Sequence, residues 1–176
     1  GYAVAKEYWK QFRLRNGIGR SLRGFSKSYQ VALPDKLHQK ARDLGKQLSL
    51  LEPSAAAFRI SQAYATELPS SYRSSNGIYY TPISLVEKML RDASDLGVDF
   101  SSQSVIDTSS GGAAFLGPLA KLMFRKDLEP ELAVRDVVRR LSGIELDPFG
   151  AWLSQFVVDC ALAELAPDVV TSEKVV

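Results

Sequence analysis

The chain has 176 residues, of which 45% are hydrophobic and 24% are charged, so it can bury a core and is not a disordered polypeptide. Its one cysteine, Cys160, excludes an internal disulfide and favours a reducing compartment. No apolar run approaches the roughly 20 residues of a membrane helix, and the first residues are not signal-like. We therefore expect a soluble, cytoplasmic protein with no membrane partner.

The formal net charge of +2 is unevenly distributed along the chain. Residues 1–50 hold eleven Lys and Arg against three Asp and Glu, a net +8, and the remaining residues carry a net −6. A basic segment in front of an acidic body suits a partner such as DNA, because neutralised phosphates supply affinity that does not depend on base sequence. Basic residues that only keep a helix solvated give the same composition. Both interpretations stay open here.

The start of the chain predicts a helix followed by a basic loop. Apolar spacing predicts a short helix over residues 2–14. Residues 16–24 combine three glycines with arginines and predict a loop that presents its charges to a partner. The candidate nucleic-acid-binding residues are Arg15, Arg20 and Arg23, and the last two are the first to test for phosphate contact.

Two further helices are expected before a domain boundary. Pro34 opens a helix to about residue 51, and Pro53 opens another to about residue 66. Residues 70–77 are polar and predict a turn. The boundary placed there divides the chain into a basic, helical N-terminal segment, residues 1–70, and an α/β domain, residues 71–176.

Two adjacent tyrosines precede the first helix of the α/β domain. Thr81 is the expected N-cap of that helix and Pro82 its first residue. Side chains alternate in an extended segment, so one of Tyr79 and Tyr80 can face the core while the other lines a pocket. Packing of both rings in the core is the alternative.

Residues 104–116 change from strand spacing to helix spacing across very small residues. Val105 and Ile106 suit a short buried strand that ends at Asp107. Residues 109–114 carry little side chain, and a helix follows, so this turn predicts a site for a nucleoside cofactor. A plain tight turn gives the same pattern. The dinucleotide pattern G-x-G-x-x-G is not met, which favours other nucleosides.

The C-terminal part predicts two further strands around a long helix. Residues 121–140 are charged and predict a helix end and an exposed insertion with one further helical turn. A strand is expected over residues 141–146, a helix of nearly five turns from Pro148, and a third strand from residues 169–171. The predicted fold class is therefore α/β, with a partial, Rossmann-like sheet of about three parallel strands with helices, preceded by an α-helical N-terminal segment.

The acid that ends the second strand is the candidate ribose ligand. In parallel sheets such an acid lies beside the turn after the first strand and accepts hydrogen bonds from ribose hydroxyls. Glu145 is the predicted ligand, and Asp147 replaces it if the strand ends later. Asp147 precedes Pro148 and can instead cap the next helix, which is the interpretation we favour. His38 has no partner at a metal-ligand spacing, so no metal site is predicted.

Three separated motifs carry a family resemblance. They are residues 76–82 (Asn-Gly-Ile-Tyr-Tyr-Thr-Pro), residues 105–116, and residues 143–148 (Gly-Ile-Glu-Leu-Asp-Pro). In this order they resemble the Tyr-Thr-Pro motif, the Asp-Pro-Ala-Cys-Gly-Ser-Gly-Ala-Phe-Leu motif and the ribose motif of S-adenosylmethionine-dependent N6-adenine DNA methyltransferases of restriction–modification systems. The resemblance implies that the predicted sheet is a partial Rossmann-like methyltransferase sheet, and it implies S-adenosylmethionine as cofactor. The implied cofactor-binding residues are Tyr79, Tyr80, Thr81, Pro82, Asp107, Ser109, Gly111, Phe115, Glu145 and Asp147.

The chain also departs from this family. Residues 108–110 are Thr-Ser-Ser instead of Pro-Ala-Cys, and Ala113 replaces a glycine, so an added methyl narrows the approach to the cofactor. The family's catalytic Asn/Asp-Pro-Pro-aromatic motif, which holds the flipped adenine, does not occur before Val176, and no catalytic residue is assigned.

The expected function follows from the resemblance and these departures. We expect the cofactor-binding part of a longer DNA adenine methyltransferase, inactive alone, with DNA and either a second copy or a missing C-terminal half as partners. The alternatives are a non-catalytic, methyltransferase-like DNA-binding or assembly module, and a methyltransferase that acts on a small molecule or a protein.

Overall fold

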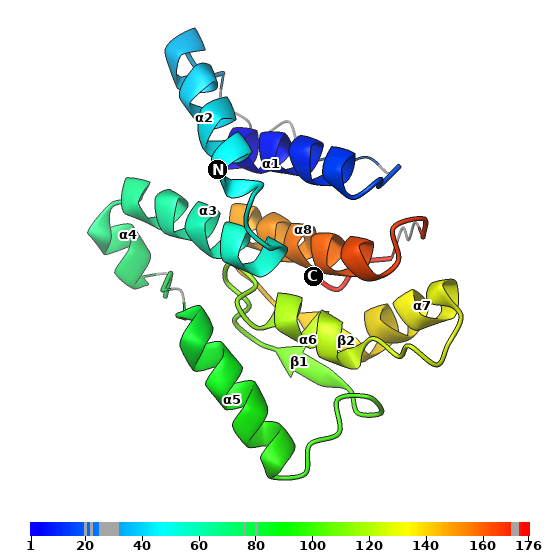
Figure 1. The fold of residues 1–176 in the computed structure, drawn as a ribbon. Helices are drawn as coiled ribbons and strands as arrows, with labels where there is room; N and C mark the ends of the chain where they lie inside the picture. Colours follow the sequence, from blue (N-terminus) through cyan, green and yellow to red (C-terminus); the bar gives the residue numbers. More distant parts are fainter. Residues whose placement is uncertain (20, 22, 25–31, 76, 80, 170–172) are drawn as a thin grey trace.

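The computed structural model describes residues 1–19, 21, 23–24, 32–75, 77–79, 81–169 and 173–176. These residues form helices and one pair of strands (Figure 1). In chain order the elements are α1 (Tyr2–Arg15), α2 (Asp35–Leu48), α3 (Pro53–Glu67), α4 (Ser70–Ser75), α5 (Ile83–Asp95), β1 (Val105–Asp107), α6 (Leu116–Met123), α7 (Pro130–Arg140), β2 (Leu141–Gly143) and α8 (Pro148–Leu165). Within these ranges, no helix has both the length and the apolar composition to cross a membrane.

The predicted partial Rossmann-like sheet of three strands is wrong. The described residues are mostly helical, and the only strands among them are β1 and β2, which pair in parallel with Val105 opposite Leu141. The third strand expected over residues 169–171 falls mostly outside the described residues, and Val169 itself is not in a strand. Valine content indicated extended backbone but could not fix its position. The C-terminal segment contacts the main chain of β2 further along the sequence, at Val175, whose carbonyl accepts a hydrogen bond from the Gly143 N–H at 2.9 Å.

The helix α8 is the centre of the core, and α3 and α6 pack against it (Figure 1). Its residues are buried on nearly every side, as expected for a helix that is apolar almost all round. The rings of Tyr8 and Trp9 on α1 contact Phe156 of α8, with ring centroids 5.9 and 6.3 Å apart. Cys160 is fully buried in α8 and packs as part of the core.

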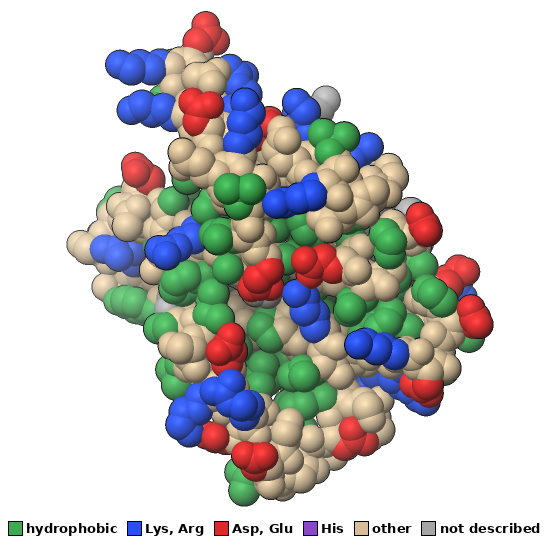
Figure 2. Space-filling model, in the orientation of Figure 1, with side chains coloured by type: hydrophobic (Ala, Val, Ile, Leu, Met, Phe, Trp, Pro, Cys, Tyr) green, Lys and Arg blue, Asp and Glu red, His purple; other side chains and the backbone are tan. Residues whose placement is uncertain are grey.

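The helix α2 packs on α1 and extends away from the rest of the structure at the top of Figure 1. The two helices approach closely at Gly45, where a Cβ atom would lie only 2.7 Å from both the Val4 carbonyl oxygen and the Glu7 Cβ. Most of α2 is exposed, and Figure 2 shows Lys and Arg side chains gathered over it. Its exposed basic residues are Lys36, Lys40, Arg42 and Lys46.

Two local predictions around the proposed domain boundary are wrong. Residues 70–75 form the short helix α4 instead of a turn, because Pro69 starts it and its carbonyl accepts the Arg73 N–H at 3.0 Å. Thr81 is not the N-cap of α5. Pro82 occupies that position in an extended conformation, and its carbonyl accepts the first helical hydrogen bonds.

The expected exposed insertion in residues 121–140 is also wrong. The helix α7 is 11 residues long, where the sequence predicted a single turn. Its many charged residues obscured an apolar face formed by Ala133, Val134, Val137 and Val138, all of which are buried. This face packs α7 against the core and brings the start of β2 to β1.

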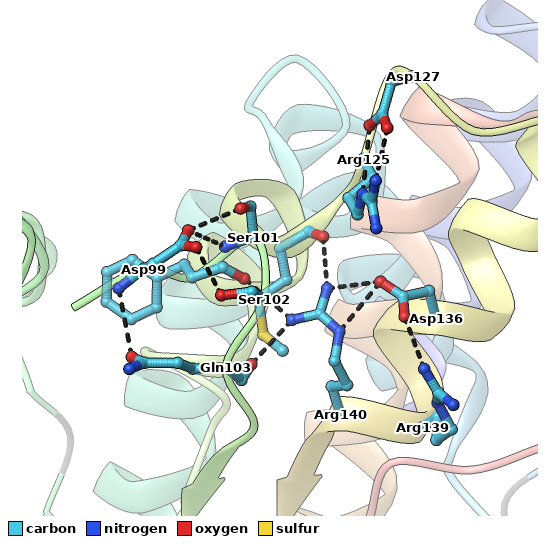
Figure 3. Close-up of polar contacts among 11 residues, drawn as sticks. Asp99, Ser101, Ser102, Gln103, Arg125, Asp127, Asp136, Arg139 and Arg140 are labelled. Carbon is cyan, nitrogen blue, oxygen red and sulfur yellow. Dashed lines mark hydrogen bonds and ion pairs between the residues drawn. The ribbon is translucent and has the colours of Figure 1, made fainter.

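Arg140, the last residue of α7, joins three segments around the start of the strands (Figure 3). It is 7% exposed, and all five of its N–H groups donate hydrogen bonds. The Nη1 atom donates to the carbonyls of Phe100 and Gln103 at 3.0 and 2.8 Å. The Nη2 atom donates to the Met123 carbonyl at 3.0 Å, and Nε and Nη2 both donate to Asp136, at 3.0 and 2.6 Å. Arg140 thereby fixes the N-terminal end of the parallel pair.

Candidate functional site

A cavity of about 270 Å³ lies at the C-terminal end of the two strands. Three segments far apart in the sequence line it: residues 77–79 after α4, residues 108, 109 and 111 after β1, and residues 144–147 with Gly150 after β2. These segments contain parts of all three motifs found in the sequence. The cavity is close to the lower end of the roughly 300–1,000 Å³ that small-molecule sites occupy, so it suits a nucleoside-sized group.

The start of the turn after β1 is held by two hydrogen bonds. Asp107 Oδ1 accepts the Ser109 N–H at 3.1 Å, and the Ser110 N–H donates to the Ile144 carbonyl at 2.9 Å. The backbone of Ala113 has φ = +62°, a left-handed conformation that glycine adopts more easily. The family motif has glycine at this position. The chain therefore keeps a glycine-type turn here while adding a buried methyl group.

Glu145 joins this turn to the start of α8. Its Oε2 accepts the Gly111 N–H at 2.7 Å, and its Oε1 accepts the Asp147 N–H at 2.8 Å. Gly150 makes room for it, because a Cβ there would lie 3.0 Å from the Glu145 Cγ. Each carboxylate oxygen can accept a second hydrogen bond. Glu145 therefore lines the cavity with acceptor capacity left over, which is what a ribose hydroxyl requires.

Asp147 is the N-cap of α8. Its Oδ2 accepts the Gly150 N–H at 2.7 Å, and its Oδ1 accepts the Tyr64 hydroxyl at 3.1 Å. Both carboxylate oxygens therefore have a stabilising role within the fold. This geometry confirms the interpretation of Asp147 as a helix cap, although the residue also lines the cavity.

The structure separates the predicted cofactor residues into two groups. The cavity brings together Tyr79, Ser109, Gly111, Glu145 and Asp147. The other described candidates do not line it: they are Thr81, Pro82, Asp107 and Phe115, and Tyr80 lies outside the described residues.

Sequence reasoning missed three apolar side chains that line the cavity. Ile78 is buried, whereas Ile144 and Leu146 are 54% and 80% exposed. The last two alternate with Glu145, and this alternation in an extended segment was the available signal. Tyr79, at 69% exposure, adds an aromatic ring to the same opening, and its hydroxyl lies 3.3 Å from the Ser74 Oγ.

The candidate nucleic-acid-binding arginines lie in different surroundings. Arg15 is exposed in the last turn of α1. Arg20 lies outside the described residues. The Nε of Arg23 donates to Asp159 Oδ2 at 2.7 Å, and its Nη2 donates to the Glu173 carbonyl at 2.7 Å. Arg23 thus has partners within the protein, which argues against a role in phosphate contact, whereas Arg15 remains available.

No group of three or more His, Cys, Asp and Glu side chains is placed to hold a metal ion among the residues that the structure describes. Comparisons of the chain with protein-family models, with curated proteins and with solved structures find no match. The resemblance to adenine methyltransferases therefore depends on the three sequence motifs alone.

Proposed function

We propose that this cavity binds the nucleoside part of S-adenosylmethionine, and that the chain is the cofactor-binding part of a DNA adenine-N6 methyltransferase. The observation that carries the proposal is the meeting of three separated motifs around one nucleoside-sized space. Glu145 offers acceptors to ribose hydroxyls, while Ile144, Leu146 and Tyr79 offer apolar surface to an adenine ring.

The bound cofactor would supply an activated methyl group. The residues of this chain would bind and orient it, because methyl transfer depends mainly on the position of the donor relative to the acceptor nitrogen. No residue of the cavity is assigned an acid–base role. The adenine would be held by the Pro-Pro-aromatic motif that this sequence lacks.

A specific observation favours a second candidate, a methyltransferase-like DNA-binding or assembly module without catalysis. Both oxygens of Glu145 already accept backbone hydrogen bonds, and both oxygens of Asp147 are used within the fold. The two carboxylates of the cavity thus have hydrogen-bond partners without a ligand. A module that had lost its cofactor would retain these contacts for stability alone.

Calorimetric titration with S-adenosylmethionine and S-adenosylhomocysteine separates the two candidates. We expect saturable binding that Glu145→Gln weakens by about tenfold, because one charged acceptor is lost. The matched control is Asp147→Asn, which keeps a good N-cap and should bind within about twofold of wild type. Tyr79→Ala should also weaken binding, whereas Tyr72→Ala on α4, outside the cavity, should not.

No heat of binding at millimolar ligand, with wild-type protein shown to be folded by circular dichroism, would favour the non-catalytic module. Equal loss of binding in Glu145→Gln and Asp147→Asn would show that Asp147 contacts the ligand in addition to capping α8.

A further inference from the structure

A second cavity, of about 520 Å³, lies beside the first. It is lined by α3, by Arg73 of α4, and by Ile78 and Tyr79. Ile78 and Tyr79 also line the first cavity, so the two spaces share a wall. A group bound in the second cavity would therefore lie next to the proposed cofactor.

The second cavity is positively charged. Arg59 of α3 and Arg73 of α4 line it, and its lining contains no Asp or Glu. Figure 2 shows basic side chains over α3 and α4, and each of these helices contains a single Lys or Arg in its sequence. Two guanidinium groups beside one space repel each other unless an anion separates them.

Arg73 has an unusual deficit of hydrogen bonds. Its Nε atom is buried and has no hydrogen-bond partner in the described structure, and neither Arg59 nor Arg73 forms an ion pair there. By contrast, each of the five arginines from residue 91 onward pairs with an Asp or Glu. A buried, unpaired donor destabilises the folded state, so packing of the fold alone does not explain an arginine at this position.

The remaining lining residues fit a nucleotide unit. The planar guanidinium groups match the oxygens of a phosphate, and Gln62 and Thr66 add polar groups. Tyr79 is 69% exposed at the shared wall and offers a ring on which a base can stack. The cavity is nearly twice as large as the first, which is more space than a carboxylate group needs.

We propose that the Arg59–Arg73 cavity binds a phosphate group of a nucleic-acid strand. The inference deepens the proposed function and rests on it for one point, that the strand is the methyl acceptor. The strand would then pass beside the cofactor cavity, with Tyr79 between the phosphate and the cofactor. The basic face of α2 would contribute only general attraction.

Fluorescence anisotropy with a labelled single-stranded oligonucleotide tests the proposal on the full chain. We expect Arg73→Gln and Arg59→Gln each to raise the Kd by about tenfold and to lower the slope of log K against log salt by about 0.7. The matched control is Arg135→Gln on α7, which removes the same charge from an exposed ion pair and should stay within about twofold of wild type. In NMR spectra, the Nε–Hε signal of Arg73 should shift when inorganic phosphate is added to wild type.

Three results would overturn the proposal: no oligonucleotide binding by wild type, equal binding by wild type and Arg73→Gln, or an equal loss in Arg135→Gln. If Arg73→Gln instead weakened S-adenosylmethionine and left the oligonucleotide unaffected, the cavity would hold the carboxylate of the cofactor, and the phosphate assignment would be wrong. Failure of the proposed function is distinguishable, because it shows in the cofactor titration while oligonucleotide binding and its loss in Arg73→Gln persist.

Discussion

Arg140 and Arg73 mark the opposite ends of the parallel pair and differ in how their donors are used. Arg140 immediately precedes β2 and donates five hydrogen bonds to groups of this chain (Figure 3). Arg73 lies beside the cavities at the C-terminal end of the strands, and its buried Nε has no hydrogen-bond partner in the described structure. The N-terminal end is therefore saturated by the protein itself, while the C-terminal end retains binding capacity.

Apolar side chains are exposed around the cavity. At the C-terminal end, Tyr79, Ile144 and Leu146 are 69%, 54% and 80% exposed. At the N-terminal end, Phe100 and Leu141 are buried. In sheets of parallel strands, ligands bind beyond the carboxyl ends of the strands. The exposed apolar side chains beside the cavity therefore lie at the end of the strands where ligands are expected to bind.

The largest expected effect is on stability at the saturated end. Arg140→Ala leaves three carbonyls without their donor and Asp136 without its partner, so we expect the free energy of unfolding to fall by about 3 kcal/mol. Arg140→Lys should restore only part of this, because an ammonium group cannot reproduce the five-donor geometry. Urea denaturation measures both. A loss below about 1 kcal/mol in Arg140→Ala would show that the network does not stabilise the fold.

The carboxylate of this network should make stability depend on pH. Hydrogen bonds from Arg140 and Arg139 outweigh burial and hold the pKa of Asp136 below its usual value. A lowered folded-state pKa means that the stabilisation is complete above the unfolded-state pKa of about 3.9 and is lost as the pH falls through the folded-state value. The free energy of unfolding of wild type should therefore approach that of Asp136→Asn as the pH is lowered from about 5 to 2.

The difference in unfolding free energy between wild type and Asp136→Asn isolates the contribution of the Asp136 carboxylate to stability. The pKa values of Asp99 and Asp127 are also lowered, by hydrogen bonds from Ser101 and Arg125 respectively, but both residues are present in the two proteins and cancel in the difference. A constant difference in unfolding free energy across this pH range, measured by urea denaturation at each pH, would contradict the assignment.

The sequence predicted some parts of this molecule better than others, for physical reasons. The helix α8 was predicted closely because its apolar spacing is uninterrupted. The position of Glu145 beside the turn after β1 was predicted because an acid that follows a parallel strand has a defined place, while its role as a ribose ligand stays a prediction. The length of α7 was missed because alternating charges conceal a narrow apolar face. The sheet was overestimated because strand propensity does not reveal which segments will pair.

The two arginines show a further limit. Nothing in the local sequence distinguishes Arg140, which is almost fully buried, from its exposed neighbour Arg139. The surroundings of Arg73 likewise depend on tertiary contacts, because residues of α3 line the cavity beside it. Burial and pairing of a charged residue are tertiary properties, so they become visible only in the structure.

The smallest expected effect is the most direct test of the comparison. Arg73→Leu removes the buried, unpaired Nε and keeps an apolar side chain of moderate size, so the free energy of unfolding should stay constant or rise by up to about 1 kcal/mol. Arg140→Leu, the same substitution at the saturated end, should lower it by about 3 kcal/mol. Urea denaturation of both variants beside wild type gives the two values.

If Arg73→Leu lost as much stability as Arg140→Leu, Arg73 would be a structural residue like Arg140, and the contrast between the two ends of the strands would fail. If stability holds while oligonucleotide binding falls, Arg73 contributes to ligand binding and not to the stability of the fold.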